Sequence, residues 1–245
     1  MRRSGTLIGW QFEAPLGEGR RMSTMQWASS VGLVVAFGGM ALLVSPASRL
    51  LGDPDRLLTQ VFGQLALWTL FAAILALVIF WEKQPLGSLW LRPLGWRSLA
   101  LGVLFAVIHI YGVYPVRTWL LGLSGLPGFA AGAEKILALP IWFRILAVIG
   151  AGVVEETVFH GYALTRLGAL LGSYWAAMGI VVPAFALVHY PLWGAGPVLS
   201  FLVSGGVSAA LFLWSRDLTA MIVCHTLVDA MGLVVTPLYV EWWRS

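Results

Sequence analysis

Charged residues are scarce in this chain. Of its 245 residues only 11% are Asp, Glu, Lys or Arg, whereas 59% are hydrophobic and the mean hydropathy is +0.86. Soluble globular domains usually carry about 25% charged residues. The composition therefore excludes a water-soluble globule and predicts an all-α fold, a polytopic bundle of transmembrane helices.

Cysteine is nearly absent as well. The single cysteine, Cys224, excludes an intramolecular disulfide and any Cys-x-x-Cys metal site. Its neighbour His225 suggests a nucleophile pair, but adjacent side chains on a helix point about 100° apart. We expect Cys224 to be a buried helix residue without a catalytic role.

Internal repeats and low-complexity tracts are also missing, which favours one membrane domain (27–245) after a tail (1–26) at the membrane interface. Apolar runs of roughly 18 residues or more predict about seven transmembrane helices, with a range of six to eight. The first run lies too deep in the chain to be a cleaved signal peptide, so we expect it to stay as an anchor. The predicted spans are 27–45, 61–81, 98–114, 141–165, 174–190, 197–214 and 218–238.

Two connecting segments have a distinct composition. Residues 82–97 combine basic residues with Trp90 and Trp96, which is typical of an interfacial segment. Residues 115–140 are rich in Gly and Pro, which predicts a loop or a short surface helix that caps one end of the bundle. Nine basic residues fall on the N-terminal side of the membrane and six on the other, which predicts a cytoplasmic N-terminus.

Two adjacent glutamates, Glu155 and Glu156, lie inside an apolar stretch long enough to span a bilayer. Acidic side chains at that depth are costly and by default mark a working site. Glu156 and His160 are four residues apart and so share one helix face. This spacing predicts that Glu156 and His160 bond each other, which leaves Glu155 free to act on water.

Two later apolar segments carry polar residues with the same spacing. Phe185 and His189 are four residues apart on one of them, and His225 and Asp229 are four apart on the last. We expect Glu155, His189, His225 and Asp229 to converge from three helices on one polar pocket.

The remaining histidine, His109, has no acidic neighbour on its predicted span. The ordinary role of such a residue is a hydrogen bond between membrane helices, and we expect that role for His109.

The three polar motifs resemble those of the CAAX prenyl protease and bacteriocin-processing (CPBP, or Abi) family of intramembrane endopeptidases. That family has Glu-Glu-x-x-x-Arg, Phe-x-x-x-His and His-x-x-x-Asn/Asp in this order. The matching residues, within a catalytic core of 140–235, are Glu155-Glu156-x-x-x-His160-Gly161, Phe185-x-x-x-His189 and His225-x-x-x-Asp229. One departure is His160, which stands where the family has an arginine and can hold Glu156 by only one hydrogen bond.

The resemblance implies hydrolysis of a peptide bond inside the membrane. Glu155 and His189 would activate a water molecule, and His225 would steady the oxyanion by an N–H group in a dry pocket. An ionised Asp229 would repel an oxyanion, so it must be protonated or must orient another donor. Glu156 completes the catalytic set that the resemblance implies, and the supporting residues are His160 and Phe185.

No cofactor is expected for this chemistry, but zinc stays open as an alternative. Members of the family were called metalloproteases, and the side chains of Glu155, His189, His225 and Asp229 are of kinds that bind zinc. We favour the metal-free mechanism because the His-Glu-x-x-His motif of zinc proteases is absent.

Other functions fit parts of the sequence. The tetrad Gly122-Leu123-Ser124-Gly125 matches the Gly-x-Ser-Gly motif of rhomboid proteases, which would make Ser124 a nucleophile, but it does not explain the glutamates. A proton-coupled transporter would use the same acids and histidines as a relay, yet the inverted repeats of such proteins are not visible. A pseudoenzyme that binds membrane partners is the third alternative.

The partners expected for an intramembrane endopeptidase are membrane lipids and a membrane-anchored protein or peptide substrate. Nucleic acid is not needed to explain the net charge of +4, because basic loops face lipid headgroups. The length and loops resemble those of bacterial family members, which predicts the bacterial inner membrane. The sequence identifies neither the bond that is cut nor the oligomeric state.

Overall fold

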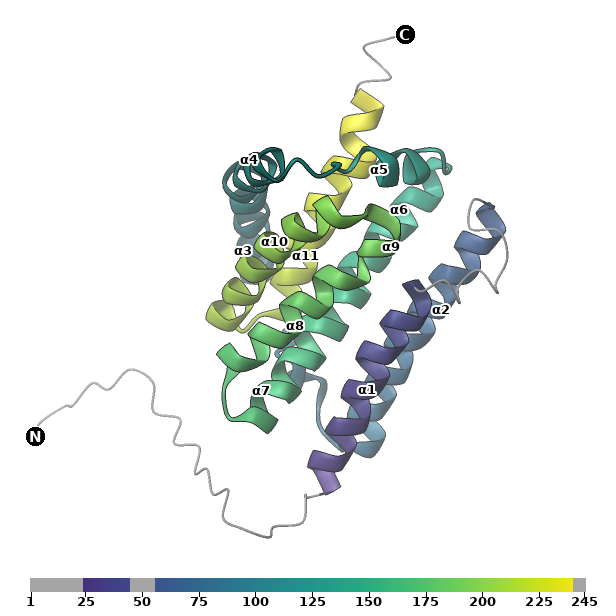
Figure 1. Cartoon of the computed structure of the whole chain (residues 1–245). Helices are drawn as coiled ribbons and strands as arrows, with labels where there is room; N and C mark the ends of the chain where they lie inside the picture. The colour runs from purple at the N-terminus through teal and green to yellow at the C-terminus, as the bar shows by residue number, and fades with distance from the viewer. Residues whose placement is uncertain (1–23, 45–55, 240–245) are drawn as a thin grey trace, which may run out of the picture.

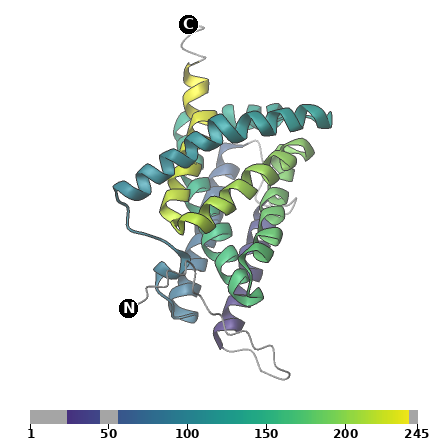
Figure 2. The same ribbon diagram turned by 90° about the vertical axis from the view of Figure 1, so that its left-hand side faces the viewer.

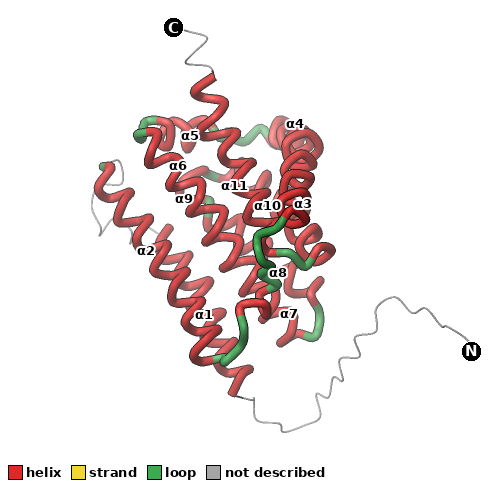
Figure 3. The backbone as a smooth tube through the Cα atoms, turned by 180° about the vertical axis from the view of Figure 1, so that it is seen from behind, coloured by secondary structure: helices red, strands yellow, loops and turns green. Residues whose placement is uncertain are grey.

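The computed structural model describes residues 24–44 and 56–239. These residues form helices joined by short loops, and no strand occurs among them (Figure 3). The prediction of an all-α fold is confirmed. The predicted interfacial tail 1–26 lies, apart from its last three residues, outside the described part of the chain.

The helices follow one another in the order shown in Figure 1, and within the described ranges four segments of π-helix interrupt the α-helices. The first group consists of α1 (Thr24–Val44), α2 (Leu57–Ala76), the π-helix η2 (Leu77–Trp81), the 3-10 helix η3 (Leu86–Leu89), α3 (Trp96–Val107), the π-helix η4 (Ile108–Val113), α4 (Tyr114–Ser124) and α5 (Ala130–Leu137). The second group consists of α6 (Ile141–Gly150), the π-helix η5 (Ala151–Leu164), α7 (Thr165–Leu171), α8 (Tyr174–Val188), α9 (Tyr190–Trp193), α10 (Ala195–Ser215), α11 (Leu218–Ala230) and the π-helix η6 (Met231–Val235).

Five helices of the described residues are long and apolar enough to cross a membrane, and each overlaps a predicted span. They are Thr24–Leu43, Leu57–Trp81, Trp96–Ser124, Ala195–Ser215 and Leu218–Tyr239. The other two predicted spans are helical as well: 141–165 lies within the run from α6 to α7, and 174–190 coincides with α8, which has only 15 residues. The protein is therefore an integral, multi-pass membrane protein.

The helix that begins at Trp96 is longer than the sequence indicated. We predicted an end at residue 114, before Pro115, but the helix continues to Ser124. Proline cannot donate a backbone hydrogen bond and its ring crowds the preceding turn. The wider turns of η4 end directly before α4, which has the proline in its first turn, and they relieve that crowding.

This long helix crosses the bundle obliquely, as the quarter-turn view shows (Figure 2). Its first part, α3, packs on α11, and its last part, α4, packs on α10. Both α4 and α5 lie at the end of the bundle where the chain leaves α11 (Figures 1 and 3). The prediction that 115–140 caps one end is thus confirmed, with helices in place of most of the loop.

The loop before this helix is anchored to the bundle. The Trp90 ring lies 4.9 Å from the Phe212 ring, and its carbonyl accepts a hydrogen bond from the backbone N–H of Leu218 (3.0 Å). Trp96 in contrast is 83% exposed. Of the two tryptophans predicted at the interface, Trp96 is largely exposed, whereas Trp90 is half-buried against the bundle.

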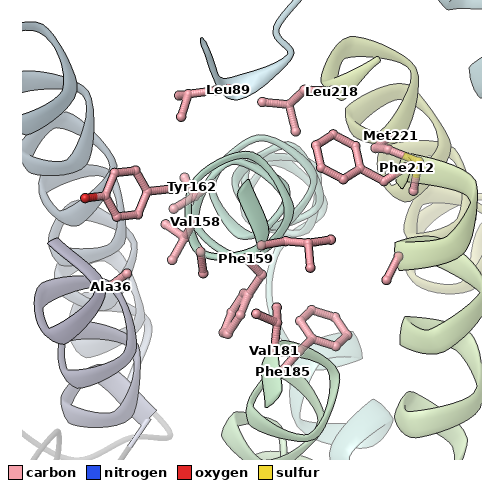
Figure 4. Close-up of a cluster of buried hydrophobic side chains, with 14 of the residues drawn as sticks. Ala36, Leu89, Val158, Phe159, Tyr162, Val181, Phe185, Phe212, Leu218 and Met221 are labelled. Carbon is pink, nitrogen blue, oxygen red and sulfur yellow. The ribbon is translucent and has the colours of Figure 1, made fainter. Parts of the chain in front are cut away.

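The π-helix η5 runs through the centre of the fold. It contacts α1, α2, α8 and α11, and its residues from Glu156 to Leu164 are all buried. Figure 4 shows it end-on: Tyr162 points toward α1 and α2, Phe159 toward α8, and Phe212 lies on the side of α10 and α11. Burial from all sides explains why this segment is apolar around its whole circumference except at the polar residues of the motifs.

A buried polar network ties η5 and α7 to the first two helices. The Glu82 carboxylate accepts hydrogen bonds from Ser29 (2.8 Å) and Tyr162 (2.9 Å) and pairs with Arg166 at 2.8 Å. The side chains of Arg166 and Glu82 are 6% and 0% exposed. This network was not predicted, because the composition of residues 82–97 indicated an interfacial segment for Glu82.

We expect the substitution Arg166→Met to destabilise the protein severely. It leaves the Glu82 carboxylate buried without its cation, and breaking a buried ion pair on one side costs about 3–5 kcal/mol. Thermal unfolding of the purified protein in detergent, followed by size-exclusion chromatography, measures the loss. Arg97→Met removes an exposed arginine and is the matched control. Equal unfolding temperatures for both variants would show that the network adds no stability.

Candidate active site

Glu156 is held between two histidines. Its Oε1 lies 2.8 Å from His225 Nδ1 and its Oε2 lies 2.7 Å from His160 Nδ1. The first contact is a hydrogen bond, whereas the second has the distance of one but not its direction. The predicted pairing of Glu156 with His160 is thus present, and a second partner from α11 joins it.

The His160 side chain is fully enclosed. It is 3% exposed, and its ring lies 5.7 Å from the Phe212 ring and 6.4 Å from the Phe185 ring. An imidazole fits between these aromatic rings and offers Glu156 one nitrogen. Enclosure of this kind fixes the position of Glu156 even though the two-pronged contact of an arginine is missing.

The π-helical geometry of η5 brings both glutamates toward the centre of the bundle. In an α-helix, neighbouring side chains diverge by about 100°, so only one of two adjacent acids can face a given site. The i→i+5 hydrogen bonds of a π-helix widen the turn and reduce that divergence. Glu155 contacts His189 at the end of α8 and Glu156 contacts His225 of α11, so the two acids face different helices.

The close approach of α11 to η5 depends on Gly152. A Cβ atom at this position would collide with the Thr226 Oγ1 atom and would lie 3.1 Å from the Thr226 backbone nitrogen. Thr226 follows His225 directly, so the absence of a side chain at Gly152 lets His225 reach Glu156. Small residues serve this purpose at many helix contacts in membranes.

Glu155 faces the end of α8. Its Oε2 lies 3.5 Å from His189 Nε2, and both side chains are mostly buried, with 16% and 15% of their surfaces exposed. That oxygen has no hydrogen-bond partner in the described part of the chain. Glu155 is therefore the less occupied of the two carboxylates.

The ring of His189 is fixed by its surroundings. Its Nδ1 lies 2.7 Å from the backbone carbonyl of Phe185, and only an N–H group can bond a carbonyl there. The ring is also packed at 4.2 Å from the Phe201 ring and at 4.7 Å from the Phe185 ring. Nδ1 therefore carries the proton and Nε2 is turned toward Glu155.

His225 links Glu156 to Asp229. Its Nδ1 bonds Glu156, and its Nε2 lies 3.4 Å from Asp229 Oδ2. Both ring nitrogens of His225 thus face a carboxylate. This arrangement fits the second option for Asp229, in which the carboxylate orients a donor and does not contact the oxyanion itself.

A cavity of about 420 Å³ adjoins these residues. Its walls come from η4, α4, η5, α8, α10, α11 and η6, and its candidate site residues are Glu156, His160, Phe185, His225 and Asp229. Glu155 and His189 are not among the lining residues, so of the four residues expected to converge on one pocket only His225 and Asp229 line this cavity. The other two lie beside the cavity, because the Phe185 and Phe201 rings that pack on His189 both line it.

The cavity is also lined by residues that were not predicted to belong to the site. His109 bonds Ser208 of α10 at 3.0 Å, which confirms the expected bond between helices, and both residues line the cavity. Arg117 of α4 lines it as well. Neither His109 nor Arg117 has an acidic neighbour along its helix, so spacing rules gave no signal for them.

Cys224 is buried as expected, with 2% of its surface exposed. Its sulfur lies 3.8 Å from His109 Nδ1 and has no contact with the His225 ring among the described contacts. Ser124 is exposed at the end of α4, where its hydroxyl donates to the Leu121 carbonyl at 2.7 Å. Within the described part of the chain no histidine bonds Ser124, so it lacks the partner of a serine nucleophile.

The donor atoms of the site do not surround a common point at which a metal ion would sit. Across residues 24–44 and 56–239, no three side chains of His, Cys, Asp or Glu are grouped closely enough to hold a metal. Glu155 and His189 form one pair, while Glu156, His225 and Asp229 form a separate chain of contacts. As placed, the proposed zinc ligands do not fit a common ion, and the absence of a cofactor stays a prediction.

Fold and site together define a class of protein, an integral membrane helix bundle with a buried glutamate–histidine centre. The family model of type II CAAX prenyl endopeptidase Rce1-like matches residues 137–231. This match confirms the family resemblance of the three motifs, which was predicted over 140–235, and supports a membrane endopeptidase in general. Searches among curated proteins and among solved structures gave no significant match.

Proposed function

We propose that this protein is an intramembrane endopeptidase that hydrolyses a peptide bond of a membrane-associated protein or peptide. The observation that carries the proposal is the contact between Glu155 and His189, 3.5 Å apart and mostly buried. It lies within the region that matches an endopeptidase family. A buried acid with a free oxygen next to a histidine is the arrangement that general base catalysis needs.

Glu155 is proposed as the base because Glu156 is already occupied. Both oxygens of Glu156 are within 2.8 Å of a histidine nitrogen, so a water molecule would have to displace one of them. The Oε2 atom of Glu155 is buried and accepts no hydrogen bond from the described residues. It can therefore take a proton from water without breaking an existing contact.

The reaction can be written with this chain's own residues. Glu155 takes one proton from a water molecule that also contacts His189 Nε2, and the water oxygen bonds the carbonyl carbon of the substrate. When the tetrahedral intermediate collapses, the C–N bond breaks. The proton on Glu155 then passes to the leaving nitrogen, which gives a free carboxylic acid and an amine.

His225 is proposed to stabilise the oxyanion of that intermediate. Glu156 and Asp229 contact its two nitrogens at 2.8 and 3.4 Å and hold the ring in place. The contact with Asp229 is long, so the Nε2–H of the fixed ring is proposed to donate to the oxyanion that develops beside Asp229. Asp229 then acts as a positioning residue, and the repulsion between its carboxylate and an oxyanion is reduced by the imidazole between them.

The surroundings proposed for the reaction follow from the helices. Membrane lipids surround the bundle, the substrate is a membrane-anchored protein or peptide, and the membrane is the bacterial inner membrane with the N-terminus in the cytoplasm. The matched family is named for CAAX prenyl substrates. For this chain the proposal is the wider class of membrane-anchored substrates, because no residue described above recognises a prenyl group.

A comparison of membranes that contain or lack the protein tests this function. New C-terminal peptides of membrane proteins, identified by mass spectrometry, are expected only where the protein is present. The same products are expected from the Ser124→Ala variant and after treatment with a metal chelator. Membranes with identical C-termini in both samples would contradict the proposal, and loss of products after chelation would favour the zinc-dependent form.

A further inference from the structure

One cation lies in the wall of the cavity among the acids. Among the described residues, Arg117 is the only Lys or Arg that lines the cavity. Two acids, Glu156 and Asp229, line the same cavity. The buried Nε–H of Arg117 has no hydrogen-bond partner in the described part of the chain. A buried donor without an acceptor destabilises the protein, so this group is suited to bind an acceptor from a ligand.

Two aromatic rings hold the guanidinium in place. Its central carbon lies 4.8 Å from the centre of the Tyr114 ring and 5.2 Å from the centre of the Phe129 ring. Stacking on aromatic faces stabilises a guanidinium and leaves the N–H groups at its edge free to donate. Arg117 is thus a positioned donor and not a mobile surface side chain.

The acids of the cavity do not satisfy this donor. Glu156 is taken up by His160 and His225. Asp229 interacts with Arg117 electrostatically, but its closest basic contact is His225 at 3.4 Å, and no ion pair joins it to Arg117. A ligand with an anionic group can therefore reach the guanidinium.

We propose that Arg117 binds the free C-terminal carboxylate of the substrate peptide. The inference rests on the proposed endopeptidase function, since it names the end of the substrate that this function would recognise. A planar guanidinium matches the two oxygens of a carboxylate, and the aromatic and aliphatic walls of the cavity suit the apolar side chains of a membrane peptide. A guanidinium also pairs with phosphate, so a lipid phosphate is the alternative that the competition measurement below distinguishes.

Binding measurements in the Glu155→Gln background test this inference without turnover. The probes are a palmitoylated pentapeptide, Leu-Val-Ala-Leu-Ala, with a free C-terminal carboxylate and its twin with a C-terminal amide. We expect the acid to bind at least about 10-fold more tightly than the amide, because a charged hydrogen bond contributes about 1.5–3 kcal/mol. Adding Arg117→Gln should abolish that preference without weakening the binding of the amide.

Further variants separate the explanations. Arg117→Lys should keep part of the preference, and Arg97→Gln, which changes an exposed arginine, should keep all of it. Equal affinity for the two peptides, or no measurable affinity for either, would overturn the proposal. An equal loss of acid and amide binding in Arg117→Gln would also overturn the proposal. It would indicate that Arg117 is a counter-ion of Asp229. Competition by phosphatidylglycerol with no preference for the acid would indicate a lipid phosphate site.

The failure of the proposed endopeptidase function and the failure of the proposed carboxylate site give different results. If the protein prefers the acid peptide through Arg117 but cleaves no peptide, the carboxylate site is supported and the proposed reaction is contradicted. If the protein cleaves acid and amide peptides equally well, with or without Arg117, the proposed reaction is supported and the carboxylate site is contradicted.

Discussion

The Glu155→Gln protein is expected to cleave its substrate about 10³-fold more slowly than the wild type, or more slowly still. An amide keeps the size of the side chain but cannot take a proton from water, and general base catalysis typically contributes 10²–10⁴-fold. Since the contact of Glu155 with His189 is long, at 3.5 Å, the fold should survive the change. The rate of peptide cleavage in detergent micelles, at matched amounts of folded protein, measures the effect.

The control for this change is Glu134→Gln. Glu134 is an exposed acid of α5 and is not part of the site, so its replacement should leave cleavage unchanged. Thermal unfolding of both variants checks that folding is equal. Cleavage by the Glu155→Gln protein at the wild-type rate would show that Glu155 is not the general base.

Replacing His225 by Phe is expected to lower kcat by about 10²–10³-fold and to leave KM nearly unchanged. The proposed N–H donor acts on charge that develops only in the transition state, and loss of one such donor has an effect of this size. The change also deprives Glu156 Oε1 of its 2.8 Å partner, so a lower unfolding temperature is expected.

Two companion variants separate these effects. Asp229→Asn should be milder, because an amide oxygen still accepts a hydrogen bond from the His225 ring. Leu227→Ala changes an exposed residue of the same helix and should have no effect on cleavage. A higher KM with an unchanged kcat in His225→Phe would show that His225 binds substrate and does not stabilise the oxyanion.

Local parts of the site could be predicted from the sequence. The contacts of Glu156 with His160 and of His225 with Asp229 join residues four apart, and helix geometry alone predicts them. Membrane helices could be located in the same way, since apolar length reflects bilayer thickness. The helix ends were less predictable, as the continuation through Pro115 shows.

The contacts between helices needed the structure. That His225 shares Glu156 with His160 depends on the approach of α11 to η5 over Gly152, and the spacing of residues along the chain did not predict this approach. The pairing of Glu82 with Arg166 joins residues 84 positions apart. Spacing rules describe one helix at a time, so they cannot show which helices pack together.

The π-helical form of η5 was not predictable either. The divergence of about 100° between neighbouring side chains suggested that only one glutamate faces the site. In η5 Glu155 contacts His189 and Glu156 contacts His225, and of the two acids only Glu156 lines the cavity. The two acids therefore keep the separate roles expected of them, but both lie in the centre of the bundle.

The most direct test of the account is a single-turnover cleavage in water enriched in heavy oxygen, read by intact-mass spectrometry. Purified wild-type and Glu155→Gln proteins are reconstituted in metal-free lipid vesicles with a membrane peptide that the wild type processes. The account predicts that the wild type releases a product with one heavy oxygen in its new carboxyl group, and that Glu155→Gln releases none. The same labelled product from Glu155→Gln at a comparable rate would contradict it.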